Sequence, residues 1–273
     1  MSSARTSGEA GSPSVAKADD SPFELSPDSD RATGAAALCL HGLTGTPHEV
    51  RPVAEALAAR GVRARGIRMA GHGESIEVLA RTRREAWVER AAGALRELRA
   101  EHDRVFLVGV SMGGLVSLRL AQVAAVDALV VIGTPLALAP PLPQLVRLLR
   151  PVVWARRKRG SDIRDPVARA RHPETAAMPL DAVAELIELQ REVVPALDRI
   201  RAPILVAHGR LDRTARPRDA ERLHRSVGSQ HRELLMLPRS GHVATVDYDG
   251  ADLARAAADF LTRPITRDDE PGA

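Results

Sequence analysis

Short apolar runs, each bounded by turn residues, alternate along most of the chain with longer amphipathic segments. Apolar runs of this length are typical of strands that helices cover on both faces, and the alternation indicates βαβ units. The sequence therefore predicts the α/β fold class, with a mainly parallel sheet flanked by helices. The predicted strands are 36–40, 62–66, 104–110, 128–132, 204–207 and 233–237, and the predicted helices are about 49–60, 84–101, 112–124, 217–226 and 251–262.

The alternation breaks between residues 135 and 200, where prolines and an arginine-rich stretch precede a helical pattern at 181–192. We interpret most of this stretch as a small cap inserted over the site. The N-terminal residues are rich in Gly, Ser, Pro and Asp, which predicts a disordered leader, although Phe23 and Leu25 allow a short edge strand there. The predicted division is a leader at 1–33, a core at 34–135 and 200–262, a cap insertion at 136–199 and a tail at 263–273.

Charge and composition bear on the partners of the protein. Lysine and arginine total 39 and aspartate and glutamate total 35, so the formal net charge is +4. Lys17 and Lys158 are the only lysines, and such an excess of arginine, with abundant alanine, is what a GC-rich genome gives. Aromatic residues make up 2% of the chain, too few to supply stacking platforms for bases. We therefore expect no nucleic-acid partner.

We expect no transmembrane segment, because no run approaches the roughly 18 to 20 apolar residues that span a bilayer. The first residues also lack the apolar region of a signal peptide. Cys39 is the one cysteine, so no intramolecular disulfide can form, and the expected location is the cytoplasm. The apolar, proline-rich segment 136–153, which basic residues follow, leaves association with a membrane surface as an alternative. Nothing in the sequence indicates an oligomeric state.

A glycine-flanked serine carries the strongest chemical signal. Ser111 lies in Gly109-Val110-Ser111-Met112-Gly113, directly after a predicted strand and directly before a predicted helix. A nucleophile on such a sharp turn has a strained backbone, and the glycines let the chain approach closely while the hydroxyl stays exposed. The motif predicts Ser111 as a nucleophile. The alternative is a glycine-rich turn in which the serine merely caps the helix.

A serine hydroxyl needs a base that takes its proton and an acid that orients the base. With a nucleophile turn of this kind, the order along the chain is serine, acid, histidine. His242 follows the last predicted strand and precedes the C-terminal helix, so it is the candidate general base. Asp212 lies in the loop after the strand 204–207, at the carboxyl edge of the sheet, and is the candidate acid. The alternatives are His208 as the base and Asp247 as the acid.

An anionic intermediate on Ser111 needs backbone N–H donors, which form an oxyanion hole. One donor is the amide of Met112, at the positive end of the dipole of the predicted helix. The second is expected from the glycine-containing loop 41–45 after the first strong strand, and we assign it to the amide of Leu43. His41 is expected to brace this loop.

Together these motifs resemble the bacterial carboxylesterase and monoacylglycerol lipase branch of the α/β hydrolases. In that branch the position of Leu43 is commonly phenylalanine, so one wall of the acyl pocket differs here while the backbone donor stays. The resemblance implies the α/β-hydrolase fold and the Ser-His-Asp triad, and it leaves the substrate undefined. It rests on segments 41–47, 71–73, 109–114 and 240–243 and on Asp212, and it covers roughly residues 34–262.

The resemblance implies hydrolysis of a carboxylic ester through an acyl-enzyme, with no metal ion and no other cofactor. A serine nucleophile argues against haloalkane dehalogenases and epoxide hydrolases, which use aspartate there. Thioesterase, carbon–carbon hydrolase and perhydrolase activities share the triad and stay open, and a binding module on the same fold is the alternative outside enzymes.

The short cap favours small-molecule esters with short to medium acyl chains. Leu142, Leu145, Val146 and Leu149 recur at three- and four-residue spacing, which places them on one helical face. Two interpretations stay open for this face: it packs on the core, or it lines the acyl pocket.

Overall fold

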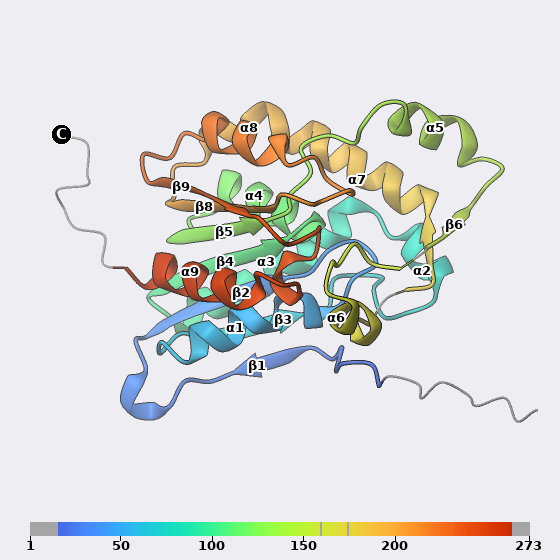
Figure 1. Cartoon of the computed structure of the whole chain (residues 1–273). Helices are drawn as coiled ribbons and strands as arrows, with labels where there is room; N and C mark the ends of the chain where they lie inside the picture. Colours follow the sequence, from blue (N-terminus) through green and yellow to red (C-terminus); the bar gives the residue numbers. More distant parts are fainter. Residues whose placement is uncertain (1–15, 159, 174, 264–273) are drawn as a thin grey trace, which may run out of the picture.

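The computed structural model describes residues 16–158, 160–173 and 175–263. Its main sheet contains β1 (Phe23–Leu25), β2 (Ala35–Leu40), β3 (Arg63–Ile67), β4 (Arg104–Val110), β5 (Ala128–Ile132), β8 (Ile204–Gly209) and β9 (Arg232–Leu237). The strand order is β1-β3-β2-β4-β5-β8-β9, and every neighbouring pair is parallel except β1 with β3 (Figure 1). The predicted α/β class with a mainly parallel sheet is therefore confirmed.

Each helix predicted for the core is present, with ends shifted by two residues or fewer. These helices are α1 (Arg51–Ala58), α3 (Arg84–Glu101), α4 (Met112–Val123), α8 (Arg218–Ser226) and α9 (Gly250–Thr262). A 3-10 turn, Pro47–Val50, supplies the start predicted for the first of them, and the short α2 (Ile76–Arg81) lies outside the predicted set. None of the helices in the described ranges is long and apolar enough to cross a membrane.

The segment between β5 and β8, called the cap segment below, begins beyond the carboxyl ends of the strands, on the right of Figure 1, and its last helix runs back over one face of the sheet. Its small hairpin pairs β6 with β7 in antiparallel fashion. The helical patterns predicted at 142–149 and 181–192 correspond to the first and the last of its helices. The elements of this segment are α5 (Leu142–Leu149), β6 (Ala155–Arg157), α6 (Pro166–Arg171), β7 (Ala177–Pro179) and α7 (Leu180–Val193).

Successive residues of β2 face opposite sides of the sheet and are buried on both. Ala36, Leu38 and Leu40 belong to a core cluster with residues of α3, α4, α7 and α8. Ala35, Ala37 and Cys39 belong to the cluster that α1 and α9 cover. Two helical layers therefore bury the sheet, which explains why its central strands are continuous apolar runs rather than alternating ones.

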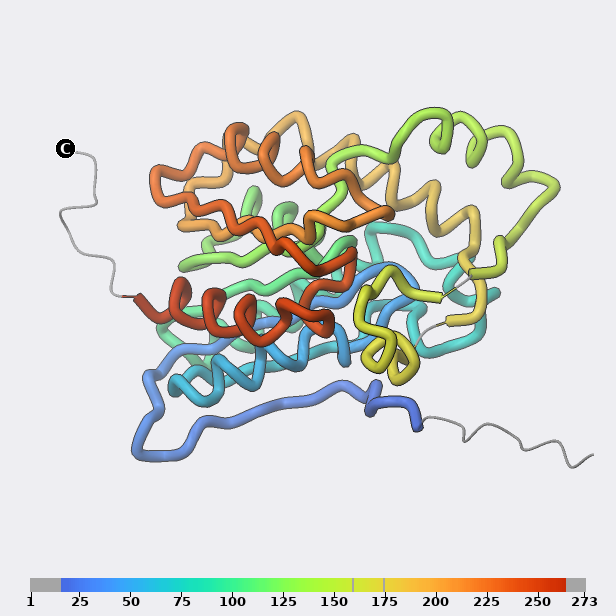
Figure 2. The backbone as a smooth tube through the Cα atoms, in the orientation of Figure 1, coloured from blue at the N-terminus to red at the C-terminus, as the bar shows by residue number. Residues whose placement is uncertain are grey.

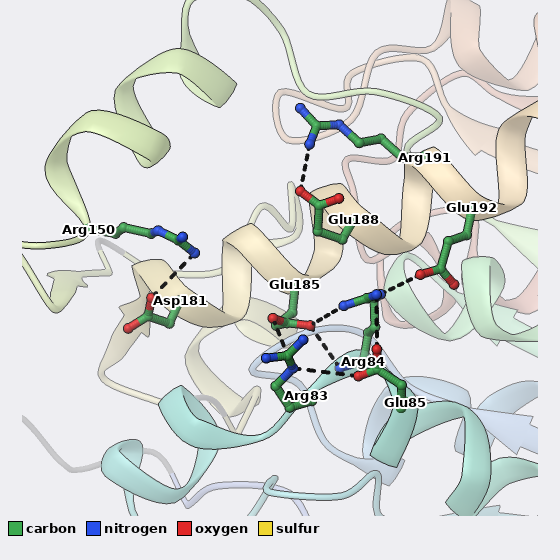
Figure 3. A network of polar contacts seen from close by, with 9 residues as sticks. All are labelled: Arg83, Arg84, Glu85, Arg150, Asp181, Glu185, Glu188, Arg191 and Glu192. Atoms are coloured by element: carbon green, nitrogen blue, oxygen red, sulfur yellow. Dashed lines mark hydrogen bonds and ion pairs between the residues drawn. The ribbon is translucent and has the colours of Figure 1, made fainter.

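Helix α7 is fixed to the core by a charged network at the start of α3 (Figure 3). The Arg84 guanidinium lies 3.0 Å from Glu185 and 2.6 Å from Glu192, both on α7, and its side chain is only 18% exposed. Such a partly buried, branched network is worth more than an isolated surface pair. It anchors α7, the last helix of the cap segment, to α3.

The described part of the predicted leader, residues 16–33, packs against the core rather than lying free of it. Strand β1 pairs with β3, as the apolar Phe23 and Leu25 allowed, and Gly66 of β3 leaves room for the ring of Phe23. Figure 2 shows this segment running beneath the molecule toward the loop that carries α6. There the amide of Ala18 donates to the carbonyl of Arg171. The predicted tail beyond Arg263 and residues 1–15 lie outside the described residues.

Gly113 allows α4 to press on β2, and this contact generates a stability prediction. A Cβ at Gly113 would lie 2.1 Å from the carbonyl oxygen of Leu40, which is backbone and cannot move aside. We expect Gly113→Ala to lower the free energy of unfolding by about 1–3 kcal/mol, measured by urea denaturation.

The matched control is Gly93→Ala in α3. Its added Cβ would meet nothing closer than Arg96 at 3.9 Å, so better helix propensity should raise stability by about 0.5–1 kcal/mol. Equal stability changes for the two variants would contradict the packing argument.

Candidate active site

Ser111 lies at the sharp turn from β4 into α4, at the carboxyl edge of the sheet. Its φ is 54° and its ψ is −114°, a strained conformation for a residue with a side chain. The turn closes tightly because Gly109 and Gly113 touch: a Cβ on Gly109 would lie 2.4 Å from the Gly113 carbonyl oxygen. The strand–turn–helix context predicted for the serine is present, and its side chain faces a cavity.

The structure brings His242 to the serine across 131 residues of sequence. His242 lies in the loop between β9 and α9, and its Nε2 is 2.9 Å from Ser111 Oγ. The other ring nitrogen, Nδ1, is 2.8 Å from Asp212 Oδ2. The backbone N–H of His242 donates to the carbonyl of Asp162 in the cap segment at 2.8 Å, which helps to hold this loop in place.

Asp212 follows β8, and its carboxylate is fixed from several directions. Oδ1 accepts hydrogen bonds from the amides of Thr214 at 2.7 Å and Ala215 at 2.8 Å. Oδ2 lies between two imidazoles, because Nε2 of the buried His208 is 2.9 Å away. His208, the alternative base, thus contacts the acid and has no contact with Ser111 among the described hydrogen bonds.

Asp247, the alternative acid, does not contact His242. Its carboxylate accepts hydrogen bonds from the backbone amides of Arg164, Asp165 and Gly241, so it ties the cap segment to the loop before His242. The structure therefore favours Asp212 as the partner of the histidine.

Charges and burial shift the pKa values of this pair in opposite directions. Burial alone would lower the pKa of His242, but the charge and the hydrogen bond of Asp212 outweigh burial, so the pKa lies above its ordinary value. Burial alone would raise the pKa of Asp212, but the neighbouring His242 and His208 hold that pKa well below its usual range. The pair is thus built to keep the carboxylate ionised and to stabilise a proton on His242.

The loop 41–45 orients its peptide groups through His41. Nε2 of His41 accepts a hydrogen bond from the amide of Met69 at 3.1 Å, so Nδ1 carries the ring proton and donates it to the Gly42 carbonyl at 2.9 Å. The amide of Gly45 donates to the same carbonyl at 3.1 Å. Because a trans peptide sets its N–H opposite its carbonyl, fixing the Gly42 oxygen also fixes the direction of the Leu43 N–H.

The amide of Met112 is the second candidate donor. Met112 is the first residue of α4, so its N–H lacks an intrahelical partner and lies at the positive end of the helix dipole. Leu43 and Ser111 line one cavity of about 180 Å³. The five residues assigned from the sequence therefore come from four separate loops or turns at one edge of the sheet.

Two adjoining cavities lie under the cap segment. The serine cavity, of about 180 Å³, has a mixed wall, in which the polar side chains include Thr44, Glu49, Ser161 and Asp162. The cap cavity, of about 360 Å³, has an apolar wall that includes Leu138, Leu142, Val146, Val183 and Leu186. The two cavities share the wall residues Leu43, Lys158, Gly160, Met178 and Thr214.

The apolar face of α5 was expected either to pack on the core or to line a pocket, and its residues differ in this respect. Val146 is buried and Leu142 is 39% exposed, and both line the cap cavity. Leu145 is 42% exposed and, like Leu149, is absent from the walls of this cavity.

A larger cavity, of about 560 Å³, lies around the amino ends of β4, β5 and β9, away from the serine.

Sequence reasoning missed three polar residues near the serine: Glu49, Ser161 and His172. Glu49 is buried and its Oε2 accepts the amide of Gly42 at 2.8 Å. His172 connects it to Ser161 of the cap segment. For Glu49 the sequence offered one indication, its position four residues after the glycine-containing loop 41–45. Ser161 and His172 come from a segment that carries no motif.

Fold and geometry define a serine hydrolase of the α/β-hydrolase class. The chain belongs to the family described as serine aminopeptidase, S33, whose pattern matches residues 32–249. The predicted resemblance to the α/β hydrolases is thereby confirmed.

Two relatives and a solved structure are similar to most of the chain. A thermostable monoacylglycerol lipase from Bacillus sp. strain H-257 is 30% identical over 233 residues, 83% of this chain and 90% of that protein. A carboxylesterase from Bacillus subtilis strain 168 is 25% identical over 230 residues, 84% of this chain and 92% of that protein. A structure from work on LipS and LipT, two metagenome-derived lipolytic enzymes, is 25% identical with a TM-score of 0.82, covering 90% of this chain and 99% of that one.

The Asp212–His242 contact predicts how the histidine titrates. We expect NMR titration of the ring protons to place the pKa of His242 above its ordinary value of 6.5. The neutral ring, which can accept a proton, then dominates only above that raised pKa. In Asp212→Asn the carboxylate is gone while burial remains, so the pKa of His242 should fall below the ordinary value. The same pKa in both proteins would show that Asp212 does not hold the histidine.

Proposed function

We propose that the protein is a carboxylic ester hydrolase in which Ser111, His242 and Asp212 form the catalytic triad. The observation that carries the proposal is the continuous chain of contacts from Ser111 Oγ to His242 at 2.9 Å and on to Asp212 at 2.8 Å, at the wall of a cavity. Both curated relatives are ester hydrolases by name, a monoacylglycerol lipase and a carboxylesterase, which supports this activity.

The reaction begins when Ser111 Oγ attacks the ester carbonyl carbon and His242 Nε2 takes the hydroxyl proton. The carbonyl oxygen becomes an oxyanion, which the amides of Leu43 and Met112 stabilise. His242 then gives its proton to the leaving alkoxide, so an alcohol departs and an acyl-enzyme remains. Water, deprotonated by the same histidine, attacks the acyl carbon, and release of the carboxylic acid restores Ser111.

The two cavities divide the substrate between them. The apolar cap cavity suits the acyl chain, and its volume of about 360 Å³ suits short to medium chains. The polar side chains in the wall of the serine cavity, among them Thr44, Ser161 and Asp162, suit the alcohol part of a small ester, and a monoacylglycerol fits this description. The substrate we propose is therefore a small ester with a short or medium acyl chain.

Removal of any triad group should abolish most turnover. We expect Ser111→Ala and His242→Ala to lower kcat for p-nitrophenyl butyrate by about 10³ to 10⁶, and Asp212→Asn to be severe as well. A fluorophosphonate probe should label the native protein and not Ser111→Ala. Near-normal rates in Asp212→Asn together with loss of activity in Asp247→Asn would overturn the assignment of the acid.

The cap cavity predicts a selective effect on acyl chain length. Leu142→Trp fills part of this cavity, so kcat/KM should fall more for p-nitrophenyl octanoate than for the acetate. Leu145→Trp is the matched control, because Leu145 lies on the same helix with nearly equal exposure but outside the cavity wall. If both variants change the octanoate-to-acetate ratio equally, or if emulsified long-chain triacylglycerol is the best substrate, the acyl site lies elsewhere.

A further inference from the structure

A buried carboxylate lies directly behind the loop that carries Leu43. Glu49 is 5% exposed, and its Oε2 accepts the amide of Gly42 at 2.8 Å. The absence of a side chain at Gly45 leaves room for this carboxylate, since a Cβ at Gly45 would lie 2.3 Å from Glu49 Oε1. A Cβ at Gly42 would lie 3.2 Å from Glu49 Oε2 and 3.3 Å from the Cβ of Ser111, so the carboxylate is close to the reacting serine.

This hydrogen bond completes the bracing of the Gly42 backbone. His41 and Gly45 hold its carbonyl, and Glu49 holds its N–H. With both polar groups of Gly42 occupied, the loop has one arrangement, and the Leu43 N–H keeps one direction. A preorganised donor stabilises an oxyanion without reorganising during the reaction.

The charge of Glu49 is nevertheless unfavourable where it lies. A buried carboxylate is costly without a partner, and a negative charge beside the serine opposes the oxyanion that forms there. Glu49 is ionised in this setting: burial alone would raise its pKa, but neighbouring histidines and the Gly42 amide lower the pKa to about 2. The buried carboxylate therefore needs a partner at its other oxygen, Oε1.

His172 of the cap segment is that partner. It is 1% exposed, and its Nε2 lies 3.4 Å from Glu49 Oε1, the ion-pair partner of Glu49 among the described residues. Its Nδ1 lies 3.0 Å from the hydroxyl of Ser161, which fixes the ring. His172 reaches Glu49 only when the cap segment is packed on the loop, because it follows α6.

The cap segment touches the same loop at a second point. Thr44 has a φ of 60°, an uncommon value for a residue with a side chain. Its hydroxyl accepts a hydrogen bond from Lys158 Nζ at 3.1 Å, and its carbonyl accepts one from the Thr175 hydroxyl at 3.3 Å. The cap segment therefore supports a loop conformation that the isolated backbone disfavours.

We propose that Glu49 is a positioning residue that fixes the Leu43 donor, and that the contact with His172 holds the Glu49 carboxylate in place, so that packing of the cap completes the oxyanion hole. The inference rests on the proposed ester-hydrolase function and adds to it a specific dependence of the reaction on a residue of the cap. Neither residue needs to touch the substrate, because both act through the loop.

The test compares the wild type with Glu49 variants by kcat, by KM and by the inhibition constant of a compound that mimics the intermediate. The inhibitor is a butyl trifluoromethyl ketone. Ser111 Oγ adds to its carbonyl carbon and the serine proton passes to His242. The ketone oxygen becomes an oxyanion, which occupies the oxyanion hole. We expect Glu49→Ala to lower kcat for p-nitrophenyl butyrate by about 10²-fold and to weaken this inhibitor in parallel, with KM nearly unchanged. Glu49→Gln keeps an oxygen acceptor for Gly42, so its loss should stay within about tenfold.

The role of His172 is tested by rescue. His172→Phe leaves the carboxylate uncompensated, so kcat should fall and inhibition should weaken. In the double variant Glu49→Gln/His172→Phe the charge is absent, so kcat should exceed that of His172→Phe alone. This pair of variants tests the proposal even if Glu49→Ala does not fold. Glu185→Gln, which weakens the cap's remote anchor to Arg84, is the control and should leave both readouts unchanged (Figure 3).

Three results would overturn the inference while leaving the proposed function intact: Glu49→Ala within about threefold of the wild type, a double variant no better than His172→Phe, or a Glu185→Gln loss equal to that of Glu49→Ala. A wild-type protein that cleaves no ester and is not labelled at Ser111 by a fluorophosphonate would overturn both.

Discussion

Helix α4 can begin directly above strand β4 because Gly109 has no side chain: a Cβ there would lie 2.4 Å from the carbonyl oxygen of Gly113. This contact forces Ser111 into the left-handed region, and the strained turn raises its hydroxyl above the edge of the sheet. The same turn makes Met112 the first residue of α4, so its N–H has no intrahelical partner. The positions of the proposed nucleophile and of one proposed oxyanion donor therefore both follow from a single packing constraint.

The rest of the site is arranged around two buried carboxylates, each paired with histidine. Asp212 contacts His242 and His208, and Glu49 contacts His172. A buried carboxylate without such partners would be protonated or would destabilise the fold. The two acids differ in what they orient: Asp212 holds an imidazole, whereas Glu49 holds a backbone amide. Burial makes both hydrogen bonds stronger than they would be in water, which suits groups that must keep a fixed direction.

The sequence predicted the core and the serine, histidine and aspartate positions because their signals are local. A turn motif between a strand and a helix, or a polar residue at a strand's end, can be recognised without knowing the fold. The partnership of Glu49 with His172 spans a cap segment with no motif, and only the fold brings the two together. On α5, periodicity placed Leu142 and Leu145 on one face, but it could not tell which of them faces the cavity. The sequence allowed a short strand at Phe23 and Leu25 but could not show its partner, because the pairing of β1 with β3 depends on which strand lies at the edge of the sheet.

The cap segment serves both as a wall and as a support, and these two duties fall on different parts of it. Helix α5 contributes apolar side chains to the cap cavity, and its outer residues remain exposed. The stretch from Lys158 to Thr175 instead contacts the loop 41–45, Glu49 and, through Asp162, the backbone of His242. Changes on α5 can therefore alter the size of the proposed acyl site without disturbing Ser111, His242 or the loop 41–45. Changes in the second stretch would instead alter the positions of the proposed oxyanion donor and base, so they would affect the rate of the reaction more than the choice of substrate.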